Sequence, residues 1–557
     1  MSQPVVVLGA GINGAALARE LLLNSVPVVL VDTADIAYGT TAYSSRLIHG
    51  GLRYLEYGDF KLVREALAER RRLLELAPQF VQPLEIQIPL SQRGGGWCAS
   101  AARFLGMPGG GDVQRGMWLI RSGLWMYDCL ARDRQLPPHR IYPAGTAGTV
   151  PVDPNRFRWM GSYWDAQMAY PECFTVALLE DARQIADSLE LEFTLYNYHR
   201  AVRDDRRLLI YSVQADDSPS EPVRVVEPLA VINATGAWVD HAMRSLDITA
   251  PRKIGGTKGT HFVTNHPDLH AALDGRGLYA QASDGRPVFV LPLKSSVLVG
   301  TTDTAYDGEP GAAVASEEEL EYLLGLVRHL LPQVPITRDD IHLHYAGVRP
   351  LPYSGDKKPG AISRRHWLER HLGGTMPLYS IIGGKLTTCR SLAEDATGQV
   401  LKDLGRQGAT NSRQRIVPGG ESYPADGEKL AQTQMTLAER FTLPVSSIVA
   451  TWSLLGTRAE RALQDSQPER DQRVLLPGCD LPRSVAKWVI RNQWVRRLDD
   501  LVERRLMLLY DPRLTKACLE DLATLLVQAG HLSTSEVPAA VAATVQRLET
   551  HFGKHVP

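Results

Sequence analysis

The feature that most constrains the fold of this chain is a glycine-rich turn between a strand and a helix near its start. The segment Val5–Leu8 is rich in β-branched residues, 15–23 is predicted to be a helix, and 28–31 is typical of a second strand. Between the first strand and the helix, residues 9–14 have the sequence GAGING, which fits the pattern GxGxxG. In this context the glycines allow a tight turn, close approach of the backbone to a pyrophosphate, and close helix packing. The sequence therefore predicts a dinucleotide-binding unit with the phosphates at the helix N-terminus.

An acidic residue closes the second strand of this unit. Asp32 follows Gly14 by 18 residues, and a carboxylate at that place accepts hydrogen bonds from the ribose of an adenosine. This favours a ligand with an unphosphorylated 2′-hydroxyl and argues against NADP. A glycine turn that binds nothing is the alternative, and the combination of strand, helix and acid disfavours it.

Composition excludes several classes of protein. The chain has 557 residues, 61 Lys and Arg against 62 Asp and Glu, and 44% hydrophobic residues, so it is too large and too apolar for a disulfide scaffold or a disordered tail. Its near-zero net charge gives no general attraction to nucleic acid. The six cysteines have no zinc-ligand spacing, so we expect reduced, mostly buried thiols and no metal site.

Because the sequence shows no secretory signal, we expect a cytoplasmic protein. The first residues lack the basic and apolar regions of a secretory signal, and no run of 18 uncharged apolar residues is present. The segment 116–128 is apolar and aromatic, with arginines around it, and is a candidate to lie in the plane of a membrane surface. A buried helix is the alternative for this segment. A glycine-bracketed stretch at 93–111 precedes it and is predicted to be a mobile loop.

The remainder of the chain divides into a β-rich part and a helical part. From 151 to 344, short β-branched runs alternate with polar turns, which predicts a mixed or antiparallel sheet. A strand at Ala230–Asn233 ends in Ala-Thr-Gly, which would place small residues beside a dinucleotide. After residue 429, apolar residues recur at helical spacing in six segments. These segments are 430–441, 445–455, 483–495, 499–509, 514–529 and 535–552.

The segment 45–56, with the sequence SRLIHGGLRYLE, carries the most specific signal. Its small residues suit a backbone that passes close to a planar ligand, although a single histidine such as His49 is more often structural than catalytic. The run resembles the signature of the FAD-dependent glycerol-3-phosphate dehydrogenases. The resemblance continues through most of the chain, at 300–303 (GTTD), 347–351 (GVRPL), 383–388 (GGKLTT) and 494–497 (WVRR), and on to Arg504 and Arg505.

The resemblance implies a fold, a cofactor and an activity. The fold would be α/β plus α, with a Rossmann-like FAD-binding domain of the glutathione-reductase and D-amino-acid-oxidase type, a mixed-sheet substrate domain and an all-helical C-terminal domain. The activity would be oxidation of sn-glycerol 3-phosphate to dihydroxyacetone phosphate. Non-covalently bound FAD would take the electrons and pass them to a membrane quinone, on the inner face of the cytoplasmic membrane. A homodimer is left open.

The predicted domain boundaries follow from the motifs and the resemblance. Residues 1–405 form the oxidoreductase core, 406–428 a linker and 429–557 the helical domain. Within the core, we predict FAD-binding segments at about 1–80, 150–250 and 345–400, interleaved with substrate-binding segments at about 81–149 and 251–344.

The glycine motif and the resemblance together give the predicted cofactor ligands. They are Gly9, Gly11, Asn13, Gly14, Asp32, Thr40, Ser44, Ser45, Leu47, His49, Gly50, Gly51, Thr235, Gly236, Gly384, Lys385, Leu386 and Thr387. The segments 258–261 and 301–303 resemble family positions that approach the flavin or the substrate, and turn chemistry is their alternative.

The substrate-binding candidates follow from the charge of a phosphomonoester, whose oxygens suit planar guanidinium groups. Arg53, Arg349 and Arg364 are the arginine candidates, with a surface ion pair as the alternative for each, and Arg365 could exchange roles with its neighbour. Tyr54 and Lys385 complete the predicted substrate site.

Oxidation of an alcohol also requires a group that takes the hydroxyl proton. His49 and Lys385 are the candidates for this base, and Arg53 is grouped with them as catalytic. A solvent-facing Lys385 after a plain glycine turn is the alternative.

Two departures from the family pattern bear on specificity and partners. Glu172 stands where the family usually carries an arginine, and it is expected to invert the charge near the active site. Gln493 stands where relatives tend to carry an acid, which puts partner contacts in doubt. A related polyol-phosphate dehydrogenase or oxidase, for example for erythritol phosphate, and a non-catalytic flavoprotein therefore remain alternatives.

Overall fold

The glycine turn lies at the end of the central strand of a six-stranded sheet in the computed structural model. The structure describes residues 3–93, 116–133, 135–213, 221–282, 286–353, 355, 365–371, 376–465 and 474–557, without the side chains of Arg53, Glu56 and Tyr57. In spatial order the strands of this sheet are β18 (Trp367–His371), β19 (Leu378–Ile382), β11 (Ala230–Asn233), β1 (Val5–Leu8), β2 (Val28–Asp32) and β7 (Phe193–Asn197). All neighbours are parallel except the edge pair β18 and β19.

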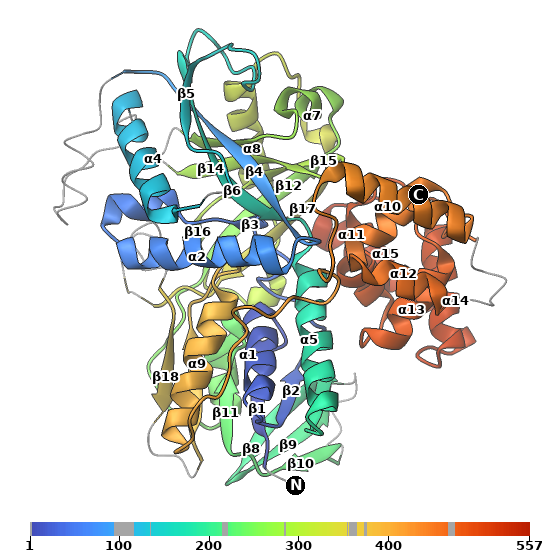
Figure 1. Cartoon of the computed structure of the whole chain (residues 1–557). Coiled ribbons are helices and arrows are strands. Elements are labelled where there is room, and N and C mark those ends of the chain that lie inside the picture. Colours follow the sequence, from blue (N-terminus) through green and yellow to red (C-terminus); the bar gives the residue numbers. More distant parts are fainter. Residues whose placement is uncertain are drawn as a thin grey trace.

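Both faces of this sheet are covered, as a parallel sheet requires. On one face α1 (Ile12–Leu23) packs between α5 (Pro171–Ser188) and α9 (Cys389–Asp403) (Figure 1). A three-stranded antiparallel sheet covers the opposite face. Its strands are β8 (His199–Asp204), β9 (Arg207–Ser212) and β10 (Arg224–Val226), and α6 (Val239–Ser245) lies beside it. The predicted Rossmann-like domain is confirmed.

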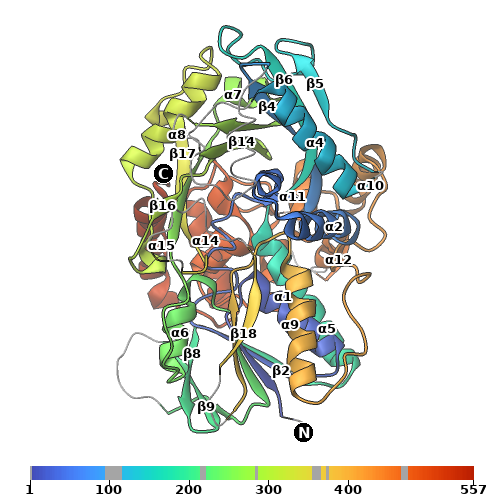
Figure 2. The same cartoon turned by 90° about the vertical axis from the view of Figure 1, so that its left-hand side faces the viewer.

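A second, mixed sheet of ten described strands lies above the first (Figure 2). Its strands are β3 (Leu47–Ile48), β4 (Val81–Leu90), β5 (Arg140–Pro143), β6 (Trp159–Met168), β12 (Thr257–Thr264), β13 (Gly277–Gln281), β14 (Pro287–Leu293), β15 (Ser296–Gly300), β16 (Thr304–Ala305) and β17 (Ile341–Arg349). Helices α7 (Pro267–Leu273) and α8 (Glu317–Leu330) cover one face. Helices α2 (Phe60–Leu76) and α4 (Met117–Ala131) cover the other.

Strands β3 and β6 and the end of β17 lie in the second sheet, although they fall in segments that we assigned to FAD binding. Strand β6 falls in the segment 150–250 that we assigned to FAD binding, yet it pairs with β4 along its whole length. The hydrogen-bonded ladder therefore places this strand in the second sheet.

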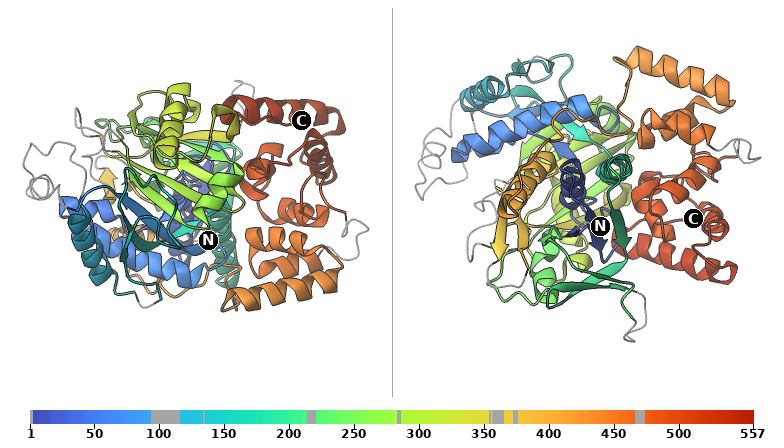
Figure 3. Two further views of the ribbon diagram at one scale, coloured as in Figure 1. Left: turned by 90° about the horizontal axis from the view of Figure 1, so that it is seen from above. Right: turned by 60° about the horizontal axis from the view of Figure 1, so that its bottom comes forward.

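The C-terminal helices pack beside the core as a separate group (Figure 3). They are α10 (Gly427–Phe441), α11 (Val445–Leu455), α12 (Arg458–Gln464), α13 (Arg483–Asn492), α14 (Lys516–Gln528) and α15 (Val537–Phe552), with a π-helical turn, η7 (Asp500–Arg505), between α13 and α14. Within the described residues, the 3₁₀ turns are η1 (Leu52–Tyr57), η2 (Gly236–Trp238), η3 (Pro310–Ala312), η4 (Arg338–Asp340), η8 (Leu508–Tyr510) and η9 (Thr534–Glu536).

Two predicted C-terminal helices are shorter or less regular than expected. The helix predicted for 483–495 ends at Asn492, because Trp494 has a φ of 51°, which an α-helix does not accommodate. The helix predicted for 499–509 is instead the π-turn η7 followed by η8. Met507, with a φ of 54°, separates the two.

Two further sequence predictions concern membrane-spanning helices and the cysteine thiols. Within the described ranges, no helix has both the length and the apolar character that crossing a membrane requires. The five cysteines in these ranges are free, and only Cys129 is exposed. Cys98 and most of the predicted mobile loop at 93–111 lie outside the described residues.

Candidate active site

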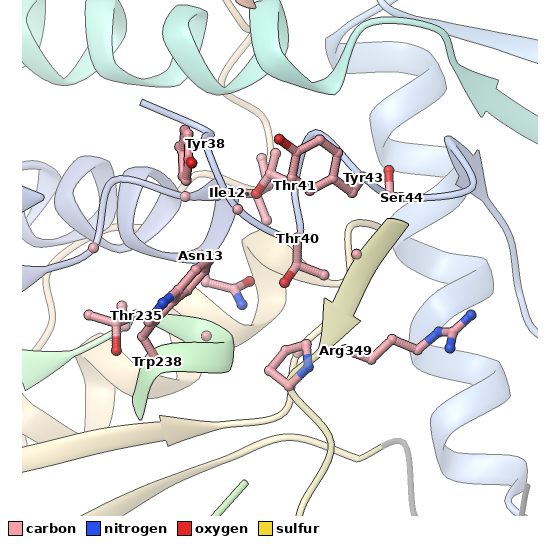
Figure 4. A pocket seen from close by; sticks show the side chains of 18 of the residues that line it. Ile12, Asn13, Tyr38, Thr40, Thr41, Tyr43, Ser44, Thr235, Trp238 and Arg349 are labelled. Carbon is pink, nitrogen blue, oxygen red and sulfur yellow. Dashed lines mark hydrogen bonds between the residues drawn. The ribbon is translucent and has the colours of Figure 1, made fainter. Parts of the chain in front are cut away.

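A cavity of about 830 Å³ opens between the two large sheets. It begins at the carboxyl ends of β1, β2 and β11, where ligands of open α/β sheets bind, and ends against β12 and β17 of the second sheet. Its volume lies within the roughly 300–1,000 Å³ that is typical of ligand sites. Figure 4 shows three of the residues that line this cavity: Asn13 of α1, Thr40 of the loop after β2, and Arg349 at the end of β17.

The glycine turn forms one end of the cavity, and its geometry explains the glycines. Gly9 has a φ of 101°, and a Cβ there would lie 2.8 Å from the carbonyl oxygen of Ala234. A Cβ on Gly14 would lie 1.8 Å from the carbonyl oxygen of Gly9. Helix α1 has no acidic residue in its first turn, and its first residues, Ile12 and Asn13, line the cavity, so its positive end faces this space. This cradle suits a phosphate.

Asp32 and Asn13 supply polar groups at the same end. The Asp32 carboxylate accepts hydrogen bonds from the backbone N–H of Ala10 (2.6 Å) and of Ala34 (2.9 Å), which fix its orientation. Burial raises the pKa of Asp32 to about 6. The Oδ1 atom of Asn13 is buried and, within the described residues, has no hydrogen-bond partner. The Asp32 carboxylate and the Asn13 Oδ1 atom are both acceptors, which suit the hydroxyl and amide donors of a bound nucleotide.

His49 lies deeper in the cavity, just after the short strand β3. Its backbone N–H donates to the hydroxyl of Thr387 (3.2 Å), which joins two segments far apart in the sequence. Burial lowers the pKa of His49 below its ordinary value, and the positive charge of Lys385 acts in the same direction, whereas Asp165 opposes them. The imidazole is therefore uncharged at neutral pH and able to accept a proton.

A buried polar network lies behind His49 and holds its backbone. The N–H of Gly50 donates to the hydroxyl of Tyr127 (2.9 Å) and to the carboxylate of Asp165 (3.3 Å). Tyr127 (2.7 Å) and Arg70 (2.7 Å) both donate to the same carboxylate oxygen of Asp165. These contacts restrict the conformation of the backbone that follows His49.

Lys385 and Tyr54 both line the cavity and contact each other there. The Nζ atom of Lys385 lies 4.0 Å from the centre of the Tyr54 ring, an arrangement that favours the charged ammonium. Gly383 and Gly384 have φ values of 78° and 110°, and this turn directs the following residues along the cavity. A positive charge is thus available to an anionic substrate.

Arg349 ends strand β17 at the opposite wall. Its guanidinium donates to the carboxylate of Asp303 (3.0 Å), to the hydroxyl of Thr301 (3.0 Å) and to the carbonyl of Thr302 (3.0 Å). These contacts fix the plane of the guanidinium, and the side chain remains about one-fifth exposed, at 22%, on the cavity side. The predicted segment 301–303 therefore reaches the site by orienting Arg349.

The cavity brings together most of the predicted site residues. Those that line it are Gly9, Gly11, Asn13, Asp32, Thr40, Ser44, Ser45, Leu47, His49, Tyr54, Thr235, Gly236, Arg349, Gly384, Lys385, Leu386 and Thr387. Gly14, Gly50 and Gly51 lie behind this lining and do not contribute to it. The side chain of Arg53 and all of Arg364 lie outside the described residues, whereas Arg365 lines the cavity and pairs with Asp59 (2.8 Å).

Several lining residues were not singled out from the sequence. Tyr38, Thr41 and Tyr43 follow β2, and the hydroxyl of Thr41 accepts the first helical N–H, that of Ile12 (3.1 Å). Their position shortly after the acid that ends the second strand is a signal that could have found them. Trp238 follows the predicted Ala-Thr-Gly turn and also lines the cavity.

His261 belongs to the segment that was predicted to approach the flavin or the substrate, and it also lines the cavity. Its Nε2 lies 2.9 Å from the hydroxyl of Ser45, and its ring stacks on that of Tyr345 with centroids 5.0 Å apart. Burial, with Arg349 nearby, lowers the pKa of His261 well below its ordinary value. His261 is therefore a second uncharged imidazole in the site.

The expectation that Glu172 inverts the charge of the active site is wrong. Its carboxylate pairs with both terminal nitrogens of Arg46 (2.7 and 3.0 Å), and both side chains are at most 1% exposed. Arg46 neutralises this charge, and Glu172 does not line the cavity. The departure at Glu172 is thus part of a buried ion pair and gives no reason to expect a different substrate.

Gln493 also has a different place from the one expected. It is buried between the core and the C-terminal domain, where its side-chain amide lies 3.4 Å from Glu180 and its carbonyl accepts from Arg505 (3.0 Å). It therefore contacts other parts of the same chain, not a surface open to a partner.

The comparisons with known proteins agree with this site. A family model described as FAD dependent oxidoreductase (DAO) matches residues 4–390. The chain therefore belongs to the FAD-dependent oxidoreductases of this family, and FAD is its cofactor. The orphaned Asn13 oxygen, the glycine cradle and Asp32 are groups that fit the adenosine and diphosphate of FAD.

Individual relatives narrow the class. The chain is 33% identical over 527 residues to the glycerol-3-phosphate dehydrogenase of Synechocystis sp., covering 90% of this chain and 88% of that protein. It is 29% identical over 506 residues to the D-erythritol 1-phosphate dehydrogenase of Brucella abortus, covering 90% and 93%. A structure of the glycerol-3-phosphate dehydrogenase from Bacillus halodurans complexed with FAD shares the fold, with a TM-score of 0.71 at 19% identity over 98% and 95% of the two chains. The resemblance to FAD-dependent glycerol-3-phosphate dehydrogenases and the predicted fold class are confirmed.

We expect Gly14→Ala to prevent retention of FAD. The added Cβ would lie 1.8 Å from the Gly9 carbonyl oxygen and would force the turn and α1 apart. The FAD-to-protein absorbance ratio after purification measures this effect. Gly398→Ala in α9 is the control, because an added Cβ there meets no atom within 4 Å. Equal FAD content in the two variants would contradict this role of the turn.

Proposed function

We propose that this protein oxidises sn-glycerol 3-phosphate at C2 to dihydroxyacetone phosphate and passes the electrons to a membrane quinone. The observation that carries the proposal is the convergence of Arg349, Lys385 and uncharged His49 on one cavity of an FAD-dependent oxidoreductase. The 33% identity to a glycerol-3-phosphate dehydrogenase supports the choice of substrate.

The two cations are suited to the phosphate. Arg349 is held in one plane by Asp303 and Thr301, so little side-chain entropy is lost when it binds a phosphate oxygen. Lys385 adds a second positive charge from another wall of the cavity. Their positions would fix the phosphate end of a three-carbon substrate.

His49 is suited to take the hydroxyl proton. It is uncharged because loss of solvent around the ring lowers its pKa, and the contacts of Gly50 with Tyr127 and Asp165 fix the adjacent backbone. The Nζ atom of Lys385 lies over the Tyr54 ring, 4.0 Å from its centre, and we assign this residue to the phosphate and His49 to the proton transfer. When bound, FAD supplies the acceptor for the hydride from C2.

A polyol phosphate with four carbons is the second candidate, because the erythritol-phosphate dehydrogenase of Brucella abortus is 29% identical. Arg349 and His49 would bind and deprotonate either substrate. The length of the cavity would therefore determine which of the two phosphates is preferred. Steady-state rates with each phosphate, a quinone analogue as acceptor and peroxide detection test the proposal. We expect the higher kcat/KM with sn-glycerol 3-phosphate and no peroxide. A preference for erythritol phosphate, or stoichiometric peroxide, would favour the alternative dehydrogenase or an oxidase.

We further propose that α4 holds the protein on the inner face of the cytoplasmic membrane. The side of α4 that packs on the protein is buried and includes Ile120, Leu124 and Tyr127. On its other side, Trp118 and Trp125 are 51% and 62% exposed. Exposed tryptophans next to a basic residue are typical of helices that lie in a lipid interface. The buried alternative thus applies to one side of α4, and the exposed side is the one that we propose to lie in lipid.

We expect the double variant Trp118→Ser and Trp125→Ser to lose most binding to anionic lipid vesicles in a co-sedimentation assay. Trp367→Ser is the matched control, because Trp367 is also exposed, at 43%, but lies on strand β18 of the other sheet. Equal binding of the double variant and the control would remove α4 from the membrane surface.

A further inference from the structure

The C-terminal domain contacts the segment that forms one wall of the FAD cavity. We call residues 33–46, between β2 and β3, the cofactor loop. It has no helix or strand of its own, and its few backbone hydrogen bonds, such as that from Ala37 to Ala10 (3.1 Å), are supplemented by side-chain contacts. Most residues of this loop line the cavity, among them Tyr38, Tyr43 and Arg46.

The first contact is at the start of the cofactor loop. The Asp35 carboxylate accepts two hydrogen bonds from the terminal nitrogens of Arg505 (2.8 and 3.0 Å) and one from Nε of Arg504 (2.7 Å). All three side chains are at most 1% exposed. Although burial opposes it, the two arginines lower the pKa of Asp35, so the carboxylate is ionised. The π-turn η7 supplies both arginines, and π-turns are frequent at functional sites.

The second contact is at the end of the cofactor loop. Arg46, with a φ of 58°, donates to the hydroxyl of Tyr510 (2.5 Å), and its guanidinium lies 4.7 Å from the centre of the Tyr510 ring. Between the two ends, Arg547 lies 3.4 Å from the hydroxyl of Tyr43 and 5.4 Å from the ring of Tyr38. The C-terminal domain therefore contacts the loop at its start, its middle and its end.

Other contacts between the same two parts of the chain do not involve the cavity. Arg458 pairs with Glu180, and Arg183 donates to the carbonyl of Asn492 (3.2 Å). Glu180 and Arg183 belong to α5, and none of these four residues lines the cavity. The interface thus has one region that holds the cofactor loop and another that only joins the two parts.

We propose that the C-terminal domain is part of the cofactor site: Arg504, Arg505 and Tyr510 hold the cofactor loop in the conformation that binds FAD. These are positioning residues, because they act through the loop. FAD affinity then depends on a domain that does not itself line the cavity. This inference does not rest on the proposed substrate.

The test is the dissociation constant of FAD, measured by titrating the full-length apoprotein and following flavin fluorescence. Arg505→Lys keeps the charge but loses the two-pronged contact with Asp35, and we expect it to weaken FAD binding about tenfold, the size of a lost charge-assisted contact. Arg458→Lys is the matched control, because it alters an arginine–carboxylate pair of the same interface away from the loop. We expect its FAD affinity to change less than about twofold.

A milder pair of variants keeps the test decisive if Arg505→Lys does not fold. Tyr510→Phe removes only the hydroxyl that Arg46 contacts, and we expect about threefold weaker FAD binding, a modest hydrogen-bond effect. Tyr423→Phe is its control, because it removes a hydroxyl contact with Trp452 remote from the loop. Equal weakening in a variant and its control, or unchanged affinity in both loop-contacting variants, would overturn the inference.

Discussion

Replacing His49 by alanine lowers the rate of flavin reduction by about 10²- to 10⁴-fold, the usual contribution of a general base. The reason is that His49 is the partly buried imidazole of the cavity whose lowered pKa keeps it uncharged and able to take the substrate hydroxyl proton. Stopped-flow reduction at saturating sn-glycerol 3-phosphate measures this step. The dissociation constant of FAD, measured separately, shows whether the cofactor site remains intact.

The pH dependence gives an independent readout of the same role. Because burial lowers the pKa of His49 below 6.5, the group is uncharged at neutral pH and becomes protonated only on acidification. We therefore expect the wild-type reduction rate to be flat near neutrality and to fall as pH decreases through that pKa. His139→Ala, which removes a histidine of the β5 region outside the cavity, serves as the control. A rate within threefold of wild type in His49→Ala would assign the proton transfer elsewhere.

Replacing Arg349 by alanine raises the KM for the phosphorylated substrate at least tenfold, because a charge-assisted contact contributes about 1.5–3 kcal/mol. We expect kcat to change less, since the group binds the phosphate and not the reacting carbon. Arg349→Lys is expected to fall between wild type and alanine, because an ammonium keeps the charge but not the planar fork held by Asp303.

The control for Arg349 is another arginine–aspartate pair. Arg252 pairs with Asp307 (2.9 Å) on an exposed surface, and neither residue lines the FAD cavity. We expect Arg252→Ala to leave KM unchanged, because exposed ion pairs contribute little. An unchanged KM in Arg349→Ala would remove this residue from the phosphate site.

The FAD-binding part of the fold could be predicted because its signal is local. The strand, glycine turn, helix and acid between residues 5 and 32 are adjacent in the sequence, and each has its own physical reason. By contrast, His49, Arg349 and Lys385 are far apart, and only the family resemblance indicated that they share a site. The structure then brought all three to one cavity.

The wrong predictions concern residues whose environment depends on contacts between distant parts of the sequence. Glu172 was expected near the active site, but its environment is set by Arg46, 126 residues away. The π-turn at 500–505 was expected to be α-helical, because apolar spacing does not distinguish bonds to the fourth residue from bonds to the fifth. Its two arginines pair with Asp35, some 470 residues away in the sequence, and no local pattern contains that contact.

The most direct test of the proposed activity is anaerobic bleaching of the visible flavin band of the purified protein on addition of sn-glycerol 3-phosphate. Glycerol and D-erythritol 1-phosphate serve as comparisons, because one lacks the phosphate and the other has one more carbon. We expect rapid bleaching with sn-glycerol 3-phosphate and none with glycerol. A flavin that stays oxidised with sn-glycerol 3-phosphate, or that bleaches only with the four-carbon phosphate, would contradict the proposed function.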